Sequence, residues 1–435
     1  AGGQMCVYPM VLPLLLLLAA NSAAGLASSE LFVAPGGSAT AAGTQADPLG
    51  GIREARDAAR KLAKPVTVRI AAGRYHAGSA AIAFDERDSG VAFVGPGNES
   101  TAGDKALSGE AVVHGGVRVT GWQRHGGIWR ARWSGARFYA LTEGNRAATL
   151  AREPDLGSGY LAARISKPFV TYSNGSLPAS FDCSERNQCS LYFSLGGFAE
   201  VEPVAAVNHS NRTISIEVMD RDPYGHDGLT SGYQKAYIQG AKEFISTNGE
   251  WALAGGFVYY RPLLDGTDPN DAVITACTAP RLLSVVGSST APDAIARNLS
   301  FTNISFVGSG FSPYWTIPPD TGGGKTFFGK APYQSNFLTA PQQMGMVYLE
   351  NASAVSVTGC RLLASGHSAV WMQGYAQHHV IQANWIEESG FMGVFIQSTC
   401  QPSSPQDRRR SMRRRVQEAP PPMCDFDSYS SPEEA

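Results

Sequence analysis

The apolar positions of this chain come in short runs separated by glycine turns, and late in the chain they recur at a fixed interval. Positions at one offset before an SG dipeptide are Phe301, Val357 and Ile381, and those five residues later are Phe306, Leu362 and Ile386. The last two units are 24 residues apart. A unit of this length, made of short strands and turns, is typical of one coil of a right-handed parallel β-helix. Coils stack about 4.8 Å apart, so equal offsets form columns and the inward columns merge into one apolar core. The sequence therefore predicts an all-β fold of this kind.

The N-terminal part predicts a strand, a glycine-rich loop, a short helix and a second strand over residues 31–70. Ile52, Ala55, Ala59 and Leu62 share one helical face, and apolar residues alternate with polar ones over 66–70. A lone amphipathic helix before a row of strands is suited to cover the open end of the solenoid, where strand edges are exposed.

The coil pattern disappears between residues 137 and 276, where longer strands alternate aromatic and polar residues. We interpret this segment as an inserted β-rich domain, a sandwich; the alternative is long loops packed on the coils. The predicted organisation is a signal peptide at 5–27, cap and first coils at 30–136, the insertion at 137–276, further coils at 277–397 and a tail at 398–435.

Outward-facing residues of the last coils are the candidates for a binding surface. Val370, Met372, Val394 and Ile396 repeat as inward positions, which leaves the outward columns Trp371 over Phe395 and Gln373 over Gln397. Aromatic rings can support sugar rings, and amides can bond to hydroxyl groups. Alternatively, the rings pack under a loop or the insertion, and the glutamines form a structural ladder.

Glycoside hydrolysis requires two carboxyl groups at a defined separation. We find no acid stacked on the outward columns of residues 369–373 and 393–397, so the catalytic pair is not identified. Glu387, with His367 near it in the coil, is the candidate for a catalytic role, and the alternative is a solvated turn carboxylate. The run DRDPYGHDG at 220–228 could offer oxygen ligands to a cation but is typical of a surface loop.

Composition and targeting signals indicate a secreted protein. The formal net charge is −2, so the body has no general field that would attract nucleic acid. Residues 11–20 form a signal-peptide core of about ten apolar residues, too short for a stable membrane anchor. Candidate glycosylation sites lie in N-x-[ST] motifs at Asn98, Asn174, Asn208, Asn211, Asn298, Asn303 and Asn351.

The cysteines fit an oxidising compartment. Cys183 and Cys189 bracket a short polar loop and could form a local disulfide, whereas Cys277 and Cys360 sit in strand-like runs as buried thiols. No metal-ligand spacing appears among them, and no cofactor is expected.

A family resemblance rests on the order of short segments over residues 31–397. The segments are FVAPGGS, ADPLGGIREARDAAR, VTVRIAAGRYH, VVHGGVRVTGW, GGIWRARW, FYALTEGNRAATLAREPD and NGEWALAGGFVYYRPL. In this order they resemble the N-terminal half of right-handed parallel β-helix proteins of the pectate-lyase-like superfamily, similar to glycoside hydrolase family 141. The resemblance implies an inserted β-sandwich and hydrolysis of polysaccharide, with the acidic catalytic pair on later coils.

Three functions are therefore compared. The first is a secreted polysaccharide glycoside hydrolase cut off before its catalytic carboxylates and inactive as written. The second is a noncatalytic carbohydrate-binding or cell-wall β-helix protein, and the third is a polysaccharide lyase. After residue 397 the repeat stops in an arginine- and proline-rich tail without apolar periodicity, which we expect to be disordered or out of frame. The expected partner of the protein is a polysaccharide, and no nucleic-acid partner is expected.

Overall fold

The chain is built almost entirely of β-strands. The computed structural model describes residues 29–97, 109–166, 168–186, 188–195, 198–217, 235–288, 294–311 and 345–397. Strands make up 47% of it and helices 5%, which confirms the predicted all-β class. The signal segment and the tail lie outside the described residues.

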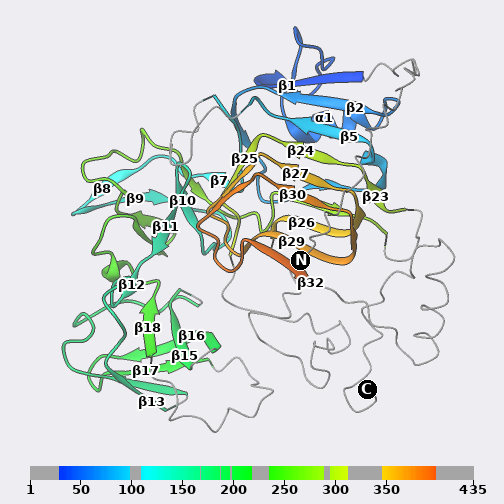
Figure 1. Ribbon diagram of the computed structural model, residues 1–435. Coiled ribbons are helices and arrows are strands. Elements are labelled where there is room, and N and C mark those ends of the chain that lie inside the picture. The colour runs from blue at the N-terminus through cyan, green and yellow to red at the C-terminus, as the bar shows by residue number, and fades with distance from the viewer. Residues whose placement is uncertain are drawn as a thin grey trace, which may run out of the picture.

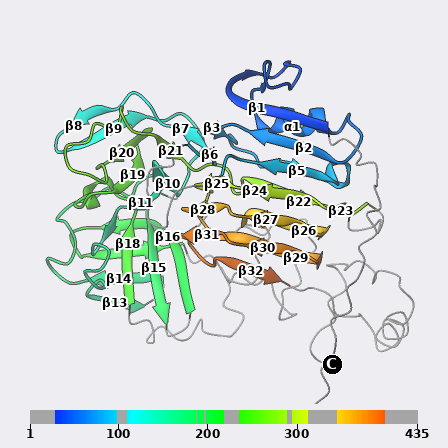
Figure 2. The same ribbon diagram turned by 45° about the horizontal axis from the view of Figure 1, so that its top comes forward.

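Three parallel sheets form one side of the molecule (Figures 1 and 2). The first sheet contains β1 (Ser29–Ser38), β2 (Val66–Ile70), β5 (Val91–Val94), β24 (Ser300–Thr302), β27 (Ser356–Thr358) and β30 (Val380–Gln382). The second contains β3 (Gly73–His76), β6 (Ala111–His114), β25 (Ile304–Val307), β28 (Arg361–Leu363) and β31 (Trp385–Glu387). The third contains β4 (Ile82–Phe84), β22 (Leu283–Val286), β26 (Gly345–Ser353), β29 (Ser368–Gln377) and β32 (Val394–Gln397), with β23 (Ala296–Arg297) beside β26. The chain visits the three sheets in turn, and we call one such passage a coil.

The register between coils agrees with the repeat found in the sequence. In the first sheet Phe301 pairs with Val357 and Val357 with Ile381. The second sheet pairs Phe306, Leu362 and Ile386 in the same way, and the third pairs Val370 with Val394 and Met372 with Ile396. Equal offsets therefore lie in adjacent strands, as predicted.

The interior between the three sheets is one apolar cluster. It runs from Leu31 in β1 to Met372 in β29. Phe93 and Phe301 stack with ring centroids 5.5 Å apart, and Phe84 packs edge-on against both. Phe93 and Phe301 lie on adjacent strands of the first sheet and Phe84 on the third, so the rings join consecutive coils and two of the three sheets.

Helix α1 (Ile52–Ala59) packs against this core near β1 and β2, as the sequence predicts. Its buried residues are Ile52, Ala55 and Ala59, while Leu62 follows the helix and is half-buried. On its other side Arg56 donates to the carbonyl of Ala83 at 2.6 Å. The helix is thus fixed by an apolar face and by bonds from Arg53 and Arg56 to backbone carbonyls in and before β4. The 3₁₀ helix η1 (Glu86–Asp88) lies nearby, and its buried Asp88 accepts from Arg60 at 2.6 Å.

Between β6 and β22 the chain leaves the three coil sheets and forms two further sheets, the first strand of which is β7 at Val117; we call this segment the insertion. It replaces the passage from β6 in the second sheet to β22 in the third. Its first sheet contains β7 (Val117–Arg118), β8 (Gln123–His125), β9 (Ile128–Arg132), β10 (Leu141–Glu143), β11 (Arg146–Leu150), β19 (Glu250–Ala254), β20 (Phe257–Tyr260) and β21 (Ile274–Ala276). Its second sheet contains β12 (Arg152–Glu153), β13 (Ala163–Ser166), β14 (Phe169–Tyr172), β15 (Ser190–Leu195), β16 (Phe198–Asn208), β17 (Thr213–Ile216) and β18 (Lys235–Gln239).

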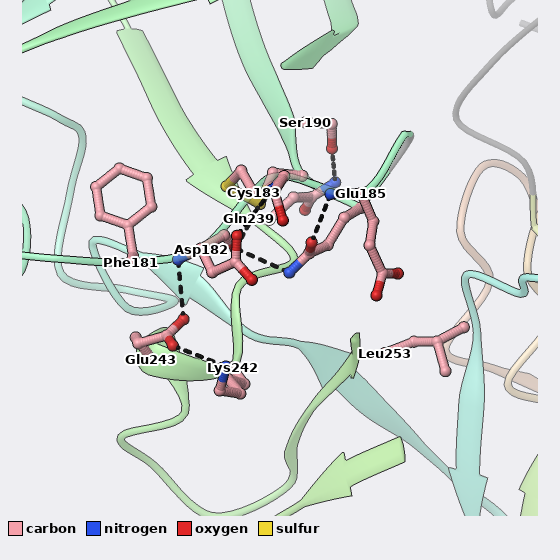
Figure 3. Close-up of a disulfide and its surroundings, with 12 residues drawn as sticks. Phe181, Asp182, Cys183, Glu185, Ser190, Gln239, Lys242, Glu243 and Leu253 are labelled. Atoms are coloured by element: carbon pink, nitrogen blue, oxygen red, sulfur yellow. Dashed lines mark hydrogen bonds and ion pairs between the residues drawn. A yellow bond between two sulfur atoms is a disulfide. The ribbon is translucent and has the colours of Figure 1, made fainter. Parts of the chain in front are cut away.

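Each sheet of the insertion has its own apolar cluster, so the two sheets are not the two faces of a single sandwich core. One cluster gathers around Trp251 and Tyr260, and the other around Phe181 and Leu191. Cys183 and Cys189 form a disulfide in the loop before β15. Figure 3 shows this loop beside the 3₁₀ helix η3 (Lys242–Phe244), where Glu243 accepts from the backbone N–H of Asp182 at 3.3 Å.

Replacing Phe301 should destabilise the coils strongly. Phe301 is 1% exposed and contacts two other rings, so Phe301→Ala leaves a cavity that its neighbours cannot fill. We expect a loss of about 3 to 5 kcal/mol in the free energy of unfolding, measured by urea titration. Phe169→Ala, which removes a ring that is 52% exposed, is the control and should change stability by less than about 1 kcal/mol. Equal losses in both variants would contradict a core that depends on the ring stack.

Candidate functional site

The outward face of the third sheet carries two side-chain columns. One column is Ser284, Tyr348, Trp371 and Phe395, and the next is Val286, Glu350, Gln373 and Gln397. Because side chains alternate along a strand, the side chains of these columns from Ser284 to Phe395 and from Val286 to Gln373 point away from the core. The strand registers therefore bring together the four residues that the sequence suggests, Trp371 with Phe395 and Gln373 with Gln397.

Trp371 is buried, although the sequence suggests an exposed aromatic platform. Its side chain is 0% exposed and forms, with Tyr348, an apolar cluster separate from the main core. Phe395 lies 4.5 Å from Trp371 between ring centroids and is half-buried. Trp371 therefore cannot stack on a sugar in this conformation and instead supports its neighbours.

Glu350 is a carboxylate that sequence reasoning missed. It is half-buried and pairs directly with Gln373 of the next coil. The hydroxyl of Tyr348 donates to Glu350 Oε2 at 2.6 Å. The sequence contains the signal that would have revealed this acid: the segment MVYLE over 346–350 matches AVWMQ over 369–373 and aligns Glu350 with Gln373. The spacing there is 23 residues, and a bulge between Glu350 and Ala352 absorbs the difference from 24. The expectation that no acid lies on these outward columns is therefore wrong.

The polar groups of this face are held in a network. Trp371 Nε1 donates to Gln373 Oε1 at 3.2 Å, and Gln373 also bonds to the Tyr348 side chain. Burial, followed by the charge of Glu350, raises the pKa of Tyr348 above its usual range, so its hydroxyl remains a donor. Arg281 lies over the Tyr348 ring, 4.4 Å from its centroid, and donates to Ser284 Oγ at 3.2 Å. These contacts fix Glu350 and Gln373 side by side on adjacent coils.

Glu387 and His367, the catalytic candidates from the sequence, lie in separate surroundings. Glu387 ends β31 in the second sheet, is exposed and accepts from Trp385 Nε1 at 3.0 Å. His367 is 5% exposed, and its ring lies 5.4 Å from Trp371 and 4.8 Å from Phe391. His367 thus belongs to the edge of the aromatic cluster on the third sheet, and Glu387 belongs to a solvated turn.

The candidate glycosylation sites differ in exposure. Asn351 is 4% exposed, and its Oδ1 accepts from the N–H of Tyr375 at 3.1 Å, so it is removed from the candidates. Asn303 is half-buried in a left-handed turn with φ 55°. The asparagines that are exposed are Asn174, Asn208, Asn211 and Asn298. Asn98 and the run at 220–228 lie outside the described residues.

Within the described ranges, no group of three or more histidine, cysteine or acidic side chains is arranged to hold a metal ion. The two free cysteines there, Cys277 and Cys360, are buried, and burial raises the pKa of both thiols, to about 12 and about 11. No helix in this part of the chain is long and apolar enough to cross a membrane.

Comparison with known proteins supports the fold. No protein-family model and no curated protein matches the chain. A solved structure described as "Glycoside hydrolase" is similar with a TM-score of 0.58 and 16% identity, over 80% of this chain and 64% of that one. A structure described as "The complex structure of XylC with xylose" aligns with a TM-score of 0.19 and 11% identity, over 85% of this chain and 64% of that one. The first likeness shows a fold shared with a glycoside hydrolase, and the chain spans less than two thirds of either solved protein.

A buried histidine lies on the outward side of the second sheet, next to the insertion. His114 is 0% exposed, and its Nε2 accepts from Arg74 Nη1 at 2.8 Å. The His76 ring stacks on it with centroids 5.4 Å apart. Burial, assisted by the positive charge of Arg74, lowers the pKa of His114 to about 3. His114 is therefore neutral at physiological pH.

Stability should fall as the pH is lowered because of His114. An unfolded histidine has a pKa of about 6.5, so between that value and about 3 the unfolded chain binds one more proton here than the folded chain. Lowering the pH from 7 to 5 should therefore destabilise the fold by roughly 2 kcal/mol, measured by urea titration at each pH. His114→Gln should lower this dependence by that amount, whereas exposed His125→Gln should leave it unchanged. An unaltered pH dependence in His114→Gln would refute this assignment.

Proposed function

We propose that this protein is a secreted carbohydrate-active protein with a right-handed parallel β-helix and that it hydrolyses a polysaccharide. Three parallel sheets visited in turn, with a 24-residue register, support the β-helix. The shared fold with a glycoside hydrolase and the order of motifs similar to glycoside hydrolase family 141 support the activity. The apolar leader and the exposed sequons at Asn174, Asn208, Asn211 and Asn298 support secretion.

Glu350 is the observation that carries the proposal. It is a half-buried carboxylate on the outward face, oriented by the Tyr348 hydroxyl and adjacent to the amide of Gln373. A glycosidase uses one carboxyl group as acid and another as base or nucleophile. In our proposal Glu350 is one of these two groups, and Gln373 binds a sugar hydroxyl beside it.

The distance to the second carboxyl group decides the stereochemistry. Equivalent positions on adjacent coils are about 4.8 Å apart, close to the separation of about 5 Å used for retention. Positions two coils apart are about 9.6 Å apart, at the upper end of the range for inversion. The coil before Glu350 carries Val286 at the same column position and the two coils after it carry glutamine, so the second acid would lie in another column.

A noncatalytic saccharide-binding protein is the second candidate function. Gln373 and Gln397 follow Glu350 in its column, which leaves one carboxylate there among the described residues. Amides bind sugar hydroxyls without transferring protons. Binding without release of reducing sugar would favour this function.

Replacing Glu350 should separate binding from catalysis. With a polysaccharide that the wild-type protein hydrolyses, Glu350→Gln should lower kcat at least about 100-fold, because the amide can neither donate nor accept the proton. Its affinity for a saccharide should change by only a few fold, since the amide has the same shape. The measurements are release of reducing sugar and calorimetric titration with an oligosaccharide.

Glu387→Gln is the matched control, because Glu387 is an exposed carboxylate at the end of the neighbouring sheet. It should retain wild-type activity. If Glu350→Gln hydrolyses as fast as the wild type, Glu350 is not a catalytic group. If the wild-type protein neither binds nor cleaves any member of a polysaccharide panel, the proposed function itself is wrong.

A further inference from the structure

One face of the insertion carries a cluster of arginine and aromatic side chains that the proposed hydrolytic site does not use. Strand β9 pairs with β8 on one side and with β20 on the other. Residues that alternate along these strands share a face. The residues that we call the arginine face are His125, Arg130, Arg132, Phe257 and Tyr259.

The opposite face of the same strands is the apolar cluster of the first inserted sheet. Trp129, Ala131, Val258 and Tyr260 belong to that cluster. Because these residues alternate with those of the arginine face, the arginine face points away from the cluster. Accordingly Arg132 and His125 are exposed, and Arg130 and Phe257 are half-buried.

The two arginines are held by an aromatic ring. Arg130 Cζ lies 4.9 Å from the centroid of the Phe257 ring and Arg132 Cζ lies 5.5 Å from it. The Tyr259 ring lies 5.5 Å from that of His125 and is 7% exposed. A guanidinium group that stacks on a ring uses its flat side. Arg130 Nε is buried without a hydrogen-bond partner, so the donors offered to a ligand are the terminal N–H groups of the two guanidinium groups.

Carboxylates near this face are engaged elsewhere. Glu185 forms an ion pair with Arg137 at 2.8 Å and accepts from the N–H of Gly255, and Glu243 pairs with Lys242 at 3.1 Å (Figure 3). No ion pair of Arg130 or Arg132 with an acid occurs among the described residues. The local sequence has the same bias, because residues 111–142 contain no Asp or Glu but contain five arginines, Arg118, Arg124, Arg130, Arg132 and Arg137.

We propose that the arginine face binds the anionic groups of an acidic polysaccharide, with Arg130 and Arg132 as the anion ligands. The inference rests on the proposed function insofar as the ligand is a saccharide. Carboxylate and sulfate groups both match the planar donors of a guanidinium. Single-stranded nucleic acid fits less well, because its bases need an open ring for stacking. Tyr259 is buried, and Phe257 is occupied by the two guanidinium groups.

Binding of alginate, a chain of carboxylated sugars, tests the proposal. In calorimetric titrations the wild-type protein should bind alginate at least about tenfold more tightly than methyl-esterified alginate, which has the same sugars without the charge. Carrageenan and agarose form the corresponding sulfated and neutral pair. Comparing the affinity for carrageenan with that for alginate shows whether the arginine face prefers sulfate or carboxylate groups. Affinity for the charged member should fall as salt is raised.

The variant R130Q/R132Q should bind alginate at least about tenfold more weakly than the wild type, and R132Q alone should lose part of the affinity. The control R164Q/R186Q removes two exposed arginines, one in β13 of the other inserted sheet and one in the loop between Cys183 and Cys189, and should bind within about twofold of the wild type. Equal thermal unfolding temperatures of all variants would show that the fold is intact. If the double variant is destabilised, the single variant R132Q replaces it as the test, because Arg132 is exposed and its substitution leaves the packing unchanged.

Wild-type affinity in R130Q/R132Q would overturn the proposal, as would equal binding of alginate and its ester, or tighter binding of single-stranded DNA. The failure of this inference is distinguishable from failure of the proposed function. Glu350→Gln should retain alginate binding through the arginine face, and R130Q/R132Q should retain hydrolysis of a short neutral oligosaccharide. If the wild-type protein neither hydrolyses a saccharide nor binds alginate, the proposed function is rejected. If it hydrolyses a saccharide but does not bind alginate, only the inference is rejected.

Discussion

Parallel backbone hydrogen bonding between successive coils is the constraint on which the rest of this structure depends. Each coil strand satisfies its N–H and C=O groups with the strands of the coils before and after it. Equal offsets must then lie side by side, and a slip of one residue would turn the inward side chains outward. The register of Phe301, Val357 and Ile381 in the first sheet is one result. The same constraint stacks the Phe93 and Phe301 rings on adjacent strands and places polar columns on the outside.

The outward columns of the third sheet show how this constraint positions chemistry. Glu350 and Gln373 lie side by side because their strands are in register, although the bulge after Glu350 changes the local spacing. Tyr348 and Trp371 form the adjacent column, and each donates a hydrogen bond to its neighbour in the polar column. Burial of the two rings removes them as a sugar platform but fixes the two polar groups. Rigid support of this kind is what a carboxylate needs if it is to act on a bound sugar.

The insertion is built differently from the coils. Its strands are mostly antiparallel, and its two sheets have separate apolar clusters. It leaves the coils after β6 and returns before β22, so both of its connections lie where the second sheet passes to the third. Its arginine face arises from strands β9 and β20, which are far apart in the sequence. Coils and insertion thus offer two surfaces of different character, one with a supported carboxylate and one with arginines on an aromatic ring.

The sequence by itself determined the elements whose signal is local or periodic. The 24-residue columns, the buried face of the helix from Ile52 to Ala59 and the pair Cys183 with Cys189 all follow from spacing and side-chain type. Only the tertiary structure decided features that depend on which distant strands meet. Glu350 lies beside Gln373 because the bulge after Glu350 accommodates the irregular spacing of 23 residues. Trp371 is buried by packing against Tyr348. Arg130 lies over the Phe257 ring because β9 pairs with β20. Periodicity records which residues are equivalent, whereas burial and partnership depend on contacts between segments that the linear pattern does not connect.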